Sequence, residues 1–292
     1  RLNLDIGPND NAIIYDLSTG ELVMVILSNF VRDPAVLEWM SEVIERGCMG
    51  MRSNRLEDPG QLPNVGYTAG SRGKALLGWT STLASGPMAR SFRELERFET
   101  DISNVFALFW NICKRSLPSE ILDDYTNVIT EAGLPRMDAN GRNPFYEISH
   151  PTLGTHRFRL TDPPTTSENR TRTELAPPGG QLAKNYCRYI HHERNLTKYI
   201  LSFTTHRSVP PSHGGNFFNS KYGIRVQAGS NRMVVWKPAD YHGTSLQDLD
   251  YGEKDPANFK QLGLATAIGA RMKKAAQNYR DGIVYIEGED EI

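Results

Sequence analysis

Cysteine is scarce in this sequence. Cys48, Cys113 and Cys187 are the only three in 292 residues, and no two of them form a CxxC pair. Disulfide frameworks and structural zinc sites need clustered or regularly spaced cysteines, so this distribution offers neither. Widely separated thiols are typical of a reducing compartment, and we expect them to be mostly buried and the protein to be cytoplasmic.

Long hydrophobic runs and an excess of charge of one sign are also missing. The longest apolar run, Leu22–Leu27, has six residues, whereas a membrane-spanning helix takes about 20. Lys+Arg 33 and Asp+Glu 34 give a formal net charge of -1, which provides no broad attraction to nucleic acid or to an anionic membrane. We expect a soluble protein without a membrane partner, and nucleic acid is not the expected partner, although a local basic groove stays open.

Several catalytic motifs are incomplete or absent. His192-Glu193 begins like the HExxH motif of zinc proteases, but Leu196 stands where the second histidine must fall. The zinc deaminase pattern needs a PCxxC segment, and no cysteine follows Cys187. GxSxG and GxxxxGK[ST] do not occur either, so a serine-hydrolase elbow and a P-loop are excluded.

Amphipathic helices are predicted in the first half of the chain. Asp33–Pro34 provides an N-cap carboxylate and a first-turn proline for a helix that Gly47 would end. Apolar faces at helical spacing predict further helices at about 89–114 and 118–131, and the residues in between, 48–88, are expected to form a long loop region. Because each helix hides only one stripe, these helices need a large apolar surface from the second half of the chain.

Short segments rich in β-branched and aromatic residues fill the second half, and they predict a barrel or sandwich of strands. The polar, proline-rich stretch Asp162–Gly180 interrupts them and predicts a mobile flap, since such long loops in compact domains are often lids. A last helix is expected at about 271–279. The predicted strands are 11–16, 21–27, 145–148, 155–160, 182–191, 197–205, 216–218, 222–227, 233–236 and 261–268.

One chemical pattern survives this survey, the pair His191-x-Glu193. In an extended strand, residues i and i+2 project from the same face, so the imidazole and the carboxylate can converge on one ion. Such a pair is expected roughly once by chance in a chain of this composition. Taken alone, it is better explained by two polar surface residues at a strand end.

The residues around this pair follow the order of a known family. An HxD/E pair at a strand end, a Gly-Gly apolar strand, a turn before another apolar strand, and a distal histidine before glycine resemble the Fe(II)/2-oxoglutarate-dependent dioxygenases. The resemblance covers about residues 180–270 and implies an α+β fold, a double-stranded β-helix (jelly-roll/cupin-like) barrel buttressed by N-terminal helices. The segments that carry it are His191-x-Glu193, Tyr199–Phe203, Gly214–Phe218, Tyr222–Val226, Met233–Trp236 and Tyr241–Thr244.

The resemblance also implies the metal and the reaction. Fe(II) would be bound by His191, Glu193 and His242, a two-histidine, one-carboxylate facial triad that leaves positions open for 2-oxoglutarate and O₂. A glutamate takes the place of the commoner aspartate. The implied activity is the oxidation of a C–H bond in a small-molecule or amino-acid-type substrate.

The cosubstrate site is where the sequence departs from the family pattern. The family usually places an arginine near the start of the last barrel strand, and Gln261 stands there, with a neutral amide that cannot form the bidentate charged pair. We expect the charge to come from Arg225 instead, because Ile224 and Val226 would pack on the helices and turn it toward the barrel interior. Arg271 is the second choice.

Two more residues are candidates for binding 2-oxoglutarate. Asn185 and Tyr189 share parity with His191 on the predicted strand 182–191, so both are expected to face the metal. In some members of the family an Asn and a Tyr upstream of the HxD pair have this role. His192 should point away from the metal.

We expect one oxygenase domain over residues 1–292. Residues 1–140 would supply helical support and outer strands, 141–270 the β-helix core, and 271–292 a C-terminal helix and tail. Two other functions stay open. A nucleic-acid base oxygenase of the same fold would need a basic groove with aromatic platforms, and a cupin-like module would bind a metal without catalysis. The sequence identifies neither the substrate nor the oligomeric state.

Overall fold

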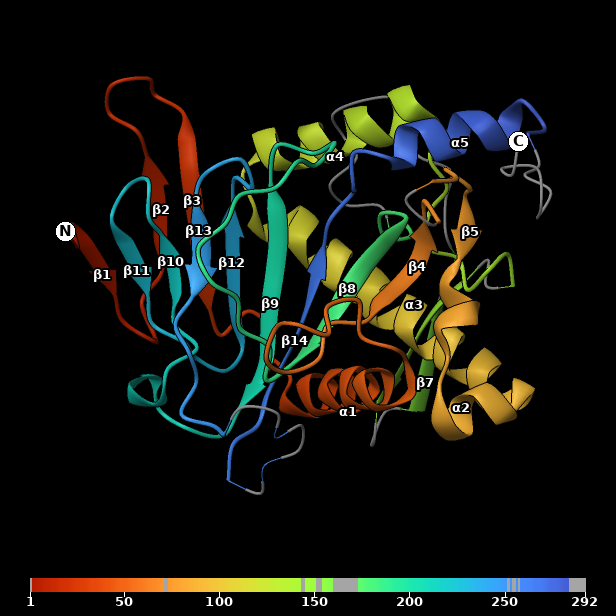
Figure 1. Cartoon of the computed structure of the whole chain (residues 1–292), viewed down its shortest axis with the longest axis horizontal. Coiled ribbons are helices and arrows are strands. Elements are labelled where there is room, and N and C mark those ends of the chain that lie inside the picture. Colours follow the sequence, from red (N-terminus) through yellow and green to blue (C-terminus); the bar gives the residue numbers. More distant parts are fainter. Residues whose placement is uncertain are drawn as a thin grey trace.

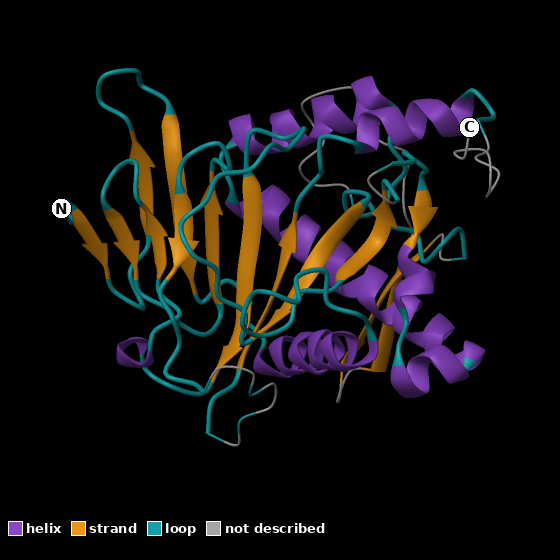
Figure 2. Ribbon diagram, in the orientation of Figure 1, coloured by secondary structure: helices purple, strands orange, loops and turns teal. Residues whose placement is uncertain are grey.

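Two β-sheets of four and eight strands, a two-stranded hairpin and a group of helices make up the described part of the protein in a computed structural model (Figure 1). The helices lie mainly on one side of the larger sheet, and the smaller sheet lies toward the N-terminal end of the molecule (Figure 2). The described residues are 2–70, 73–142, 145–150, 154–159, 173–250, 253, 256 and 258–283, with the backbone alone for 145–150 and 154–159.

The larger sheet has eight strands in the order β2-β3-β12-β9-β14-β8-β4-β5. All of its pairings are antiparallel. Its strands are β2 (Ala12–Tyr15), β3 (Leu22–Ser28), β12 (Arg232–Trp236), β9 (Ile200–Arg207), β14 (Gln261–Thr266), β8 (Gly179–Lys184), β4 (Asn64–Thr68) and β5 (Gly78–Trp79).

The smaller sheet has the order β1-β11-β10-β13, and a separate hairpin pairs β6 with β7. A bridge between His191 and His242 adds the segment before β9 to the edge of the smaller sheet. From β8 to β14 the chain therefore passes back and forth between the two sheets. The strands are β1 (Leu4–Ile6), β11 (Ile224–Val226), β10 (Phe217–Asn219), β13 (His242–Thr244), β6 (Phe145–His150) and β7 (Gly154–Arg159).

Both faces of the larger sheet are covered. Successive side chains of a strand alternate between the two faces. On β12, Met233 and Val235 belong to the core between sheet and helices, whereas Val234 and Trp236 contact the core between the two sheets. This is the side-chain period of two expected of a strand covered on both sides. The site described below lies between the sheets.

Helices cover the other face of the larger sheet, as the sequence predicted. They are α1 (Pro34–Gly50), α2 (Gly86–Arg90), α3 (Phe92–Ser116), α4 (Ser119–Ala132) and α5 (Met272–Arg280), with short 3₁₀ turns η1 (Thr80–Leu83) and η3 (Pro211–His213). The Asp33 side chain caps α1 by accepting from the backbone N–H groups of Ala35 and Val36. Gly133 ends α4 in the left-handed conformation, at φ 57.

The sequence predicted that α1 ends at Gly47. This prediction is wrong, because the helix continues to Gly50. The reason is tertiary packing. A Cβ at Gly47 would lie 2.3 Å from Cδ1 of Leu182 and 2.8 Å from the ring of Phe98. The glycine is needed for close approach of α1 to β8 and α3, not for a turn.

Residues 48–88 and the flap also differ from their predictions. The supposed loop region contains β4, β5, η1 and α2. Of Asp162–Gly180, residues 162–172 lie outside the described residues, but the rest is anchored. Glu174 is buried, lies 3.1 Å from the Lys114 ammonium and 3.2 Å from the Arg136 guanidinium, and accepts from Nε1 of Trp110. The acidic end of the expected tail, Glu287–Ile292, lies outside the described residues as well.

None of the helices within the described ranges combines the length and the hydropathy needed to cross a bilayer. This agrees with the short apolar runs of the sequence. The predicted cytoplasmic location is not tested by it and stays a prediction.

Tyr125 ties the helical layer to the larger sheet and provides a test of this packing. Its buried hydroxyl lies 3.0 Å from the backbone oxygens of Tyr199 and Thr266. Tyr125→Phe should lower the free energy of unfolding by about 0.5–1.5 kcal/mol, because a hydrogen bond between the buried hydroxyl and the sheet backbone is lost. Chemical denaturation measures this. Tyr279→Phe, at an exposed tyrosine, is the control, and equal stability of the two variants would contradict the packing described.

Candidate metal centre

His191, Glu193 and His242 converge at one end of the space between the sheets. Each offers one ligand atom, and these atoms all lie within 4.8 Å of one another. Nε2 of His242 is 3.9 Å from Oε1 of Glu193, and the two imidazole centroids are 4.4 Å apart. The structure thus brings together the three residues that the sequence proposed as metal ligands.

Backbone pairing holds these ligands in place. The N–H of His191 donates to the carbonyl of His242 and the N–H of His242 donates back, both at 2.8 Å. The N–H of Glu193 donates to the carbonyl of Pro238 at 2.9 Å. Side chains directly opposite each other in such a pair lie on the same face of the sheet, which is why the two imidazoles meet.

Hydrogen bonds also fix the tautomer of both imidazoles. Nδ1 of His191 lies 2.9 Å from the carbonyl oxygen of Tyr189, and Nδ1 of His242 lies 2.8 Å from that of Asp240. A carbonyl oxygen only accepts, so each Nδ1 carries the proton and each Nε2 keeps a lone pair for a metal. Burial is the main cause that lowers the pKa of both histidines, which favours the neutral, metal-binding form.

The donor set fits a divalent transition metal. Two neutral imidazoles and one carboxylate on one side of a site are the ligands of a facial triad. Nothing in the described part of the chain closes the opposite side, because the triad borders a cavity of about 200 Å³ between the sheets. The residues present therefore fit Fe(II), which His191, Glu193 and His242 would hold beside that cavity.

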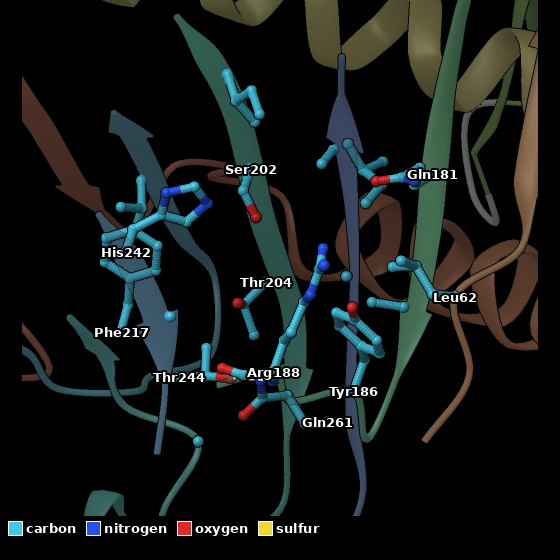
Figure 3. Close-up of a pocket in the computed structure, with 18 of the residues that line it drawn as sticks. Leu62, Gln181, Tyr186, Arg188, Ser202, Thr204, Phe217, His242, Thr244 and Gln261 are labelled. Atoms are coloured by element: carbon cyan, nitrogen blue, oxygen red, sulfur yellow. Dashed lines mark hydrogen bonds between the residues drawn. The ribbon is translucent and has the colours of Figure 1, made fainter. Parts of the chain in front are cut away.

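The cavity is lined from both sheets, and it contains a cation that the sequence analysis missed. Figure 3 shows Arg188 pointing into its centre, between Thr204 of β9 and Tyr186. Among the described residues, Arg55 and Arg188 are the arginines or lysines that line it. A positive side chain therefore faces the open side of the triad.

Asp58 holds this part of the wall from outside the cavity. Its Oδ2 accepts from the Tyr186 hydroxyl at 2.7 Å and lies 3.5 Å from Nε of Arg188. Burial raises the pKa of Tyr186, so its hydroxyl stays protonated and donates. The backbone N–H of Arg188 donates to Oγ1 of Thr244 at 2.8 Å. The Asp58 carboxylate thus lies beside the Arg188 side chain, and Thr244 holds the Arg188 backbone.

Gln261 lines the cavity, as expected from its place at the start of β14. Its side-chain oxygen accepts from the buried Arg207 guanidinium. The remaining Arg207 donors go to the backbone oxygens of Val209, Pro210 and Gly214. Arg207 thus supports Gln261 from behind and is not itself in the cavity wall.

The expected orientation of Arg225 is wrong. Ile224 and Val226 are buried in the core between the sheets, which turns Arg225 to the outer face of β11. There its Nε donates to Oδ1 of Asp5 at 2.8 Å. The expectation inverted the two faces because it assumed that the helices cover this strand, whereas the smaller sheet packs on the larger one.

Arg271 is also outside the cavity wall. It precedes α5, and its guanidinium donates to the backbone oxygens of Ala69 and Gly70. Neither arginine that the sequence proposed for the cosubstrate therefore faces the triad.

Asn185 and Tyr189 do not face the triad either. The strand predicted at 182–191 stops at Lys184, because Asn185 has the left-handed φ of 52. The Asn185 side chain accepts from the N–H of Gln261 and donates to the carbonyl of Phe259, and Tyr189 is 69% exposed. The break at Asn185 invalidates the parity argument, and it is also why Arg188 was missed.

His192 points away from the triad, as predicted. Its ring packs against that of Tyr241, with centroids 4.9 Å apart. Both side chains are exposed.

Comparison with known proteins supports the fold. No family model and no curated protein matches the sequence. The structure of NgTET1 in complex with 5mC DNA is similar at a TM-score of 0.52 and 10% identity, over 97% of this chain and 88% of that one. A prolyl-4-hydroxylase of Pseudomonas putida matches at a TM-score of 0.36 and 11% identity, over 84% and 91%.

A putative oxygenase from Shewanella oneidensis matches at a TM-score of 0.33 and 12% identity, over 89% of this chain and 91% of that one. The similarity with a TM-score above 0.5, that to the NgTET1 structure, shows a shared fold. The resemblance that the sequence suggested is therefore confirmed at the level of the fold.

Replacing His191, Glu193 or His242 by alanine should abolish metal binding and leave the fold intact, since the side chains lie at strand ends outside the main core. Loss of an outer partner of a metal ligand typically costs about 10–100-fold in affinity, and loss of a ligand should cost more. Calorimetric titration with Mn(II) measures this. His192→Ala is the matched control, and wild-type affinity in two of the three ligand variants would rule out the triad.

Proposed function

We propose that the protein is a non-heme Fe(II)/2-oxoglutarate-dependent oxygenase that oxidises a C–H bond. The observation that carries this proposal is the convergence of His191, Glu193 and His242 within 4.8 Å beside a cavity. The passage of the chain between the two sheets from β8 to β14 supports a double-stranded β-helix. Residues 1–292 would form a single oxygenase domain around it.

Arg188 is the residue we propose for the cosubstrate carboxylate, in place of Arg225. A dicarboxylate between the sheets needs a cation, because an unpaired carboxylate in a dry pocket is strongly unfavourable. Arg188 lines the cavity, with Asp58 3.5 Å from its Nε and its backbone held by Thr244. Gln261, supported by Arg207, would donate its amide N–H groups to the same ligand.

The residues of the chain would position the reactants and keep water out. When bound, Fe(II) would supply the redox chemistry for activating O₂. Phe217 and Trp236 pack around His242, with ring centroids 5.9 and 5.4 Å from its own. This apolar wall limits solvent access and strengthens the electrostatic contacts of Arg188 with a bound carboxylate.

The substrate we propose is a small molecule or an amino-acid-type compound. A nucleic-acid base oxygenase is the second candidate, favoured by the similarity to the NgTET1 structure, whose partner is 5mC DNA. Binding of DNA that weakens steeply with salt would support this second candidate. Metal binding without 2-oxoglutarate turnover under any substrate would favour a cupin-like module instead.

Arg188→Gln should raise the dissociation constant for 2-oxoglutarate by about 30-fold or more, the equivalent of roughly 2 kcal/mol, because a carboxylate loses its cation. Mn(II) affinity should stay nearly unchanged. Titration of the Mn(II)-loaded protein with 2-oxoglutarate, in the absence of O₂, measures both constants.

Arg225→Gln is the control for this prediction, since its guanidinium already pairs with Asp5 on the outer face of β11. It should have little effect on 2-oxoglutarate binding. If Arg225→Gln weakens binding and Arg188→Gln does not, the cosubstrate site is elsewhere than proposed.

A further inference from the structure

A buried cation without an acidic partner lies directly behind the wall of the metal cavity. Arg207 is 9% exposed, and none of the described aspartates and glutamates forms an ion pair with it. Burial lowers its pKa to about 10, and no acidic neighbour counters this shift. The guanidinium therefore keeps its charge at neutral pH. Buried charges are normally paired, because an unpaired one is strongly unfavourable.

Neutral oxygens surround Arg207 where a carboxylate would be expected. Its Nη1 donates to Oε1 of Gln261. The other donors reach backbone carbonyls, from Nε at 2.8 Å to Val209, and from Nη2 at 3.0 Å to Pro210 and at 2.7 Å to Gly214. These contacts hold the guanidinium in place and leave its charge uncompensated.

Arg207 also determines which atom of the Gln261 amide is turned toward it. A guanidinium only donates, so the atom beside it must be the amide oxygen. The two N–H groups of Nε2 remain, and no described residue accepts from them. Gln261 is half-buried and lines the metal cavity. The cavity wall therefore offers N–H donors at this point, with a positive charge behind them.

Gln261 lies at the end of the cavity away from His242 (Figure 3). Gly215 lines the cavity at the same place, because a Cβ built on it would lie 3.0 Å from Nη1 of Arg207 and 3.2 Å from Oε1 of Gln261. A molecule that binds the metal through one end can thus meet Gln261 with its other end. 2-Oxoglutarate has this form, with a 2-oxo acid group at one end and a second carboxylate at the other.

We propose that Arg207 is a positioning residue that makes the site select a 2-oxo acid with a second carboxylate. It would hold the Gln261 amide with its N–H groups toward that carboxylate and add a nearby positive charge, without touching the ligand itself. Arg188 would pair with the cosubstrate directly. This inference rests on the proposed oxygenase function, and it deepens that function by assigning the residue that determines the cosubstrate class.

Gln261→Glu tests this arrangement with a small change, since it replaces one NH₂ group by an oxygen of similar size. The new carboxylate would pair with Arg207, so the variant should be at least as stable as the wild type in chemical denaturation. It loses both donors and repels a second carboxylate. We expect it to bind 2-oxoglutarate at least about 100-fold more weakly, because charged hydrogen bonds are lost. Titration of the Mn(II)-loaded chain without O₂ measures this, and Mn(II) affinity should stay nearly unchanged.

The selectivity itself is measured with 2-oxopentanoate, which has the same chain length but no second carboxylate. Arg207→Met should weaken 2-oxoglutarate binding by about tenfold or more and leave 2-oxopentanoate binding nearly unchanged, because only the former carries the charge that Arg207 compensates. Arg207→Lys keeps the charge and should retain most of the selectivity. Arg225→Met, at an arginine paired with Asp5 on the outer face of β11, is the matched control.

A purely structural role of Arg207 would weaken the binding of both acids alike, and this result would overturn the inference. So would equal binding of the two acids by the wild type, unchanged selectivity in Arg207→Met, or wild-type affinity for 2-oxoglutarate in Gln261→Glu. A marked loss of stability in Gln261→Glu would contradict the uncompensated charge. If Arg207→Met does not fold, the Gln261→Glu measurements still decide. Failure of the proposed function looks different, because the Mn(II)-loaded wild type would then bind neither acid.

Discussion

The reciprocal backbone pairing of His191 with His242 is the contact on which the rest of the site depends. It joins the segment after β8 to β13 and sets two imidazoles on one face. It also directs each Nδ1 to a nearby carbonyl, which leaves both Nε2 atoms for a metal. Glu193 follows two residues later and completes the donor set. The convergence of the three proposed ligands is thus a consequence of strand pairing.

The helical layer supports this pairing indirectly, by covering the opposite face of the larger sheet. A sheet that carries a site on one face must bury its other face, and α1, α3 and α4 provide that cover. The face between the sheets is then free to combine apolar residues with Ser202, Thr204 and Arg188 around the cavity. Stability and chemistry are therefore divided between the two faces of the same strands.

The sequence predicted what depends on local periodicity. The long helices and most strands follow from apolar spacing, caps and turns, and His191, Glu193 and His242 follow from an ordered pattern of segments. The predictions that were wrong depend on single backbone angles or on which layer covers a strand. The left-handed Asn185 ends a strand that looked continuous, which removed Asn185 and Tyr189 from the site and hid Arg188.

The prediction for Arg225 was wrong because it depends on which layer covers the strand. Alternation shows that Arg225 and its neighbours Ile224 and Val226 lie on opposite faces, but it does not say which face is buried. That depends on the packing of the smaller sheet against the larger one, which no local pattern encodes. Gly47 is a similar case, since its close contact with Leu182 is long-range in the sequence.

The most direct test of the central claim is an anaerobic crystal structure with Fe(II) and 2-oxoglutarate. The account predicts one metal ion bound by Nε2 of His191, Nε2 of His242 and the Glu193 carboxylate, with a 2-oxoglutarate carboxylate paired with Arg188. Metal density at any other residues, or a triad that stays empty at saturating Fe(II), would contradict it.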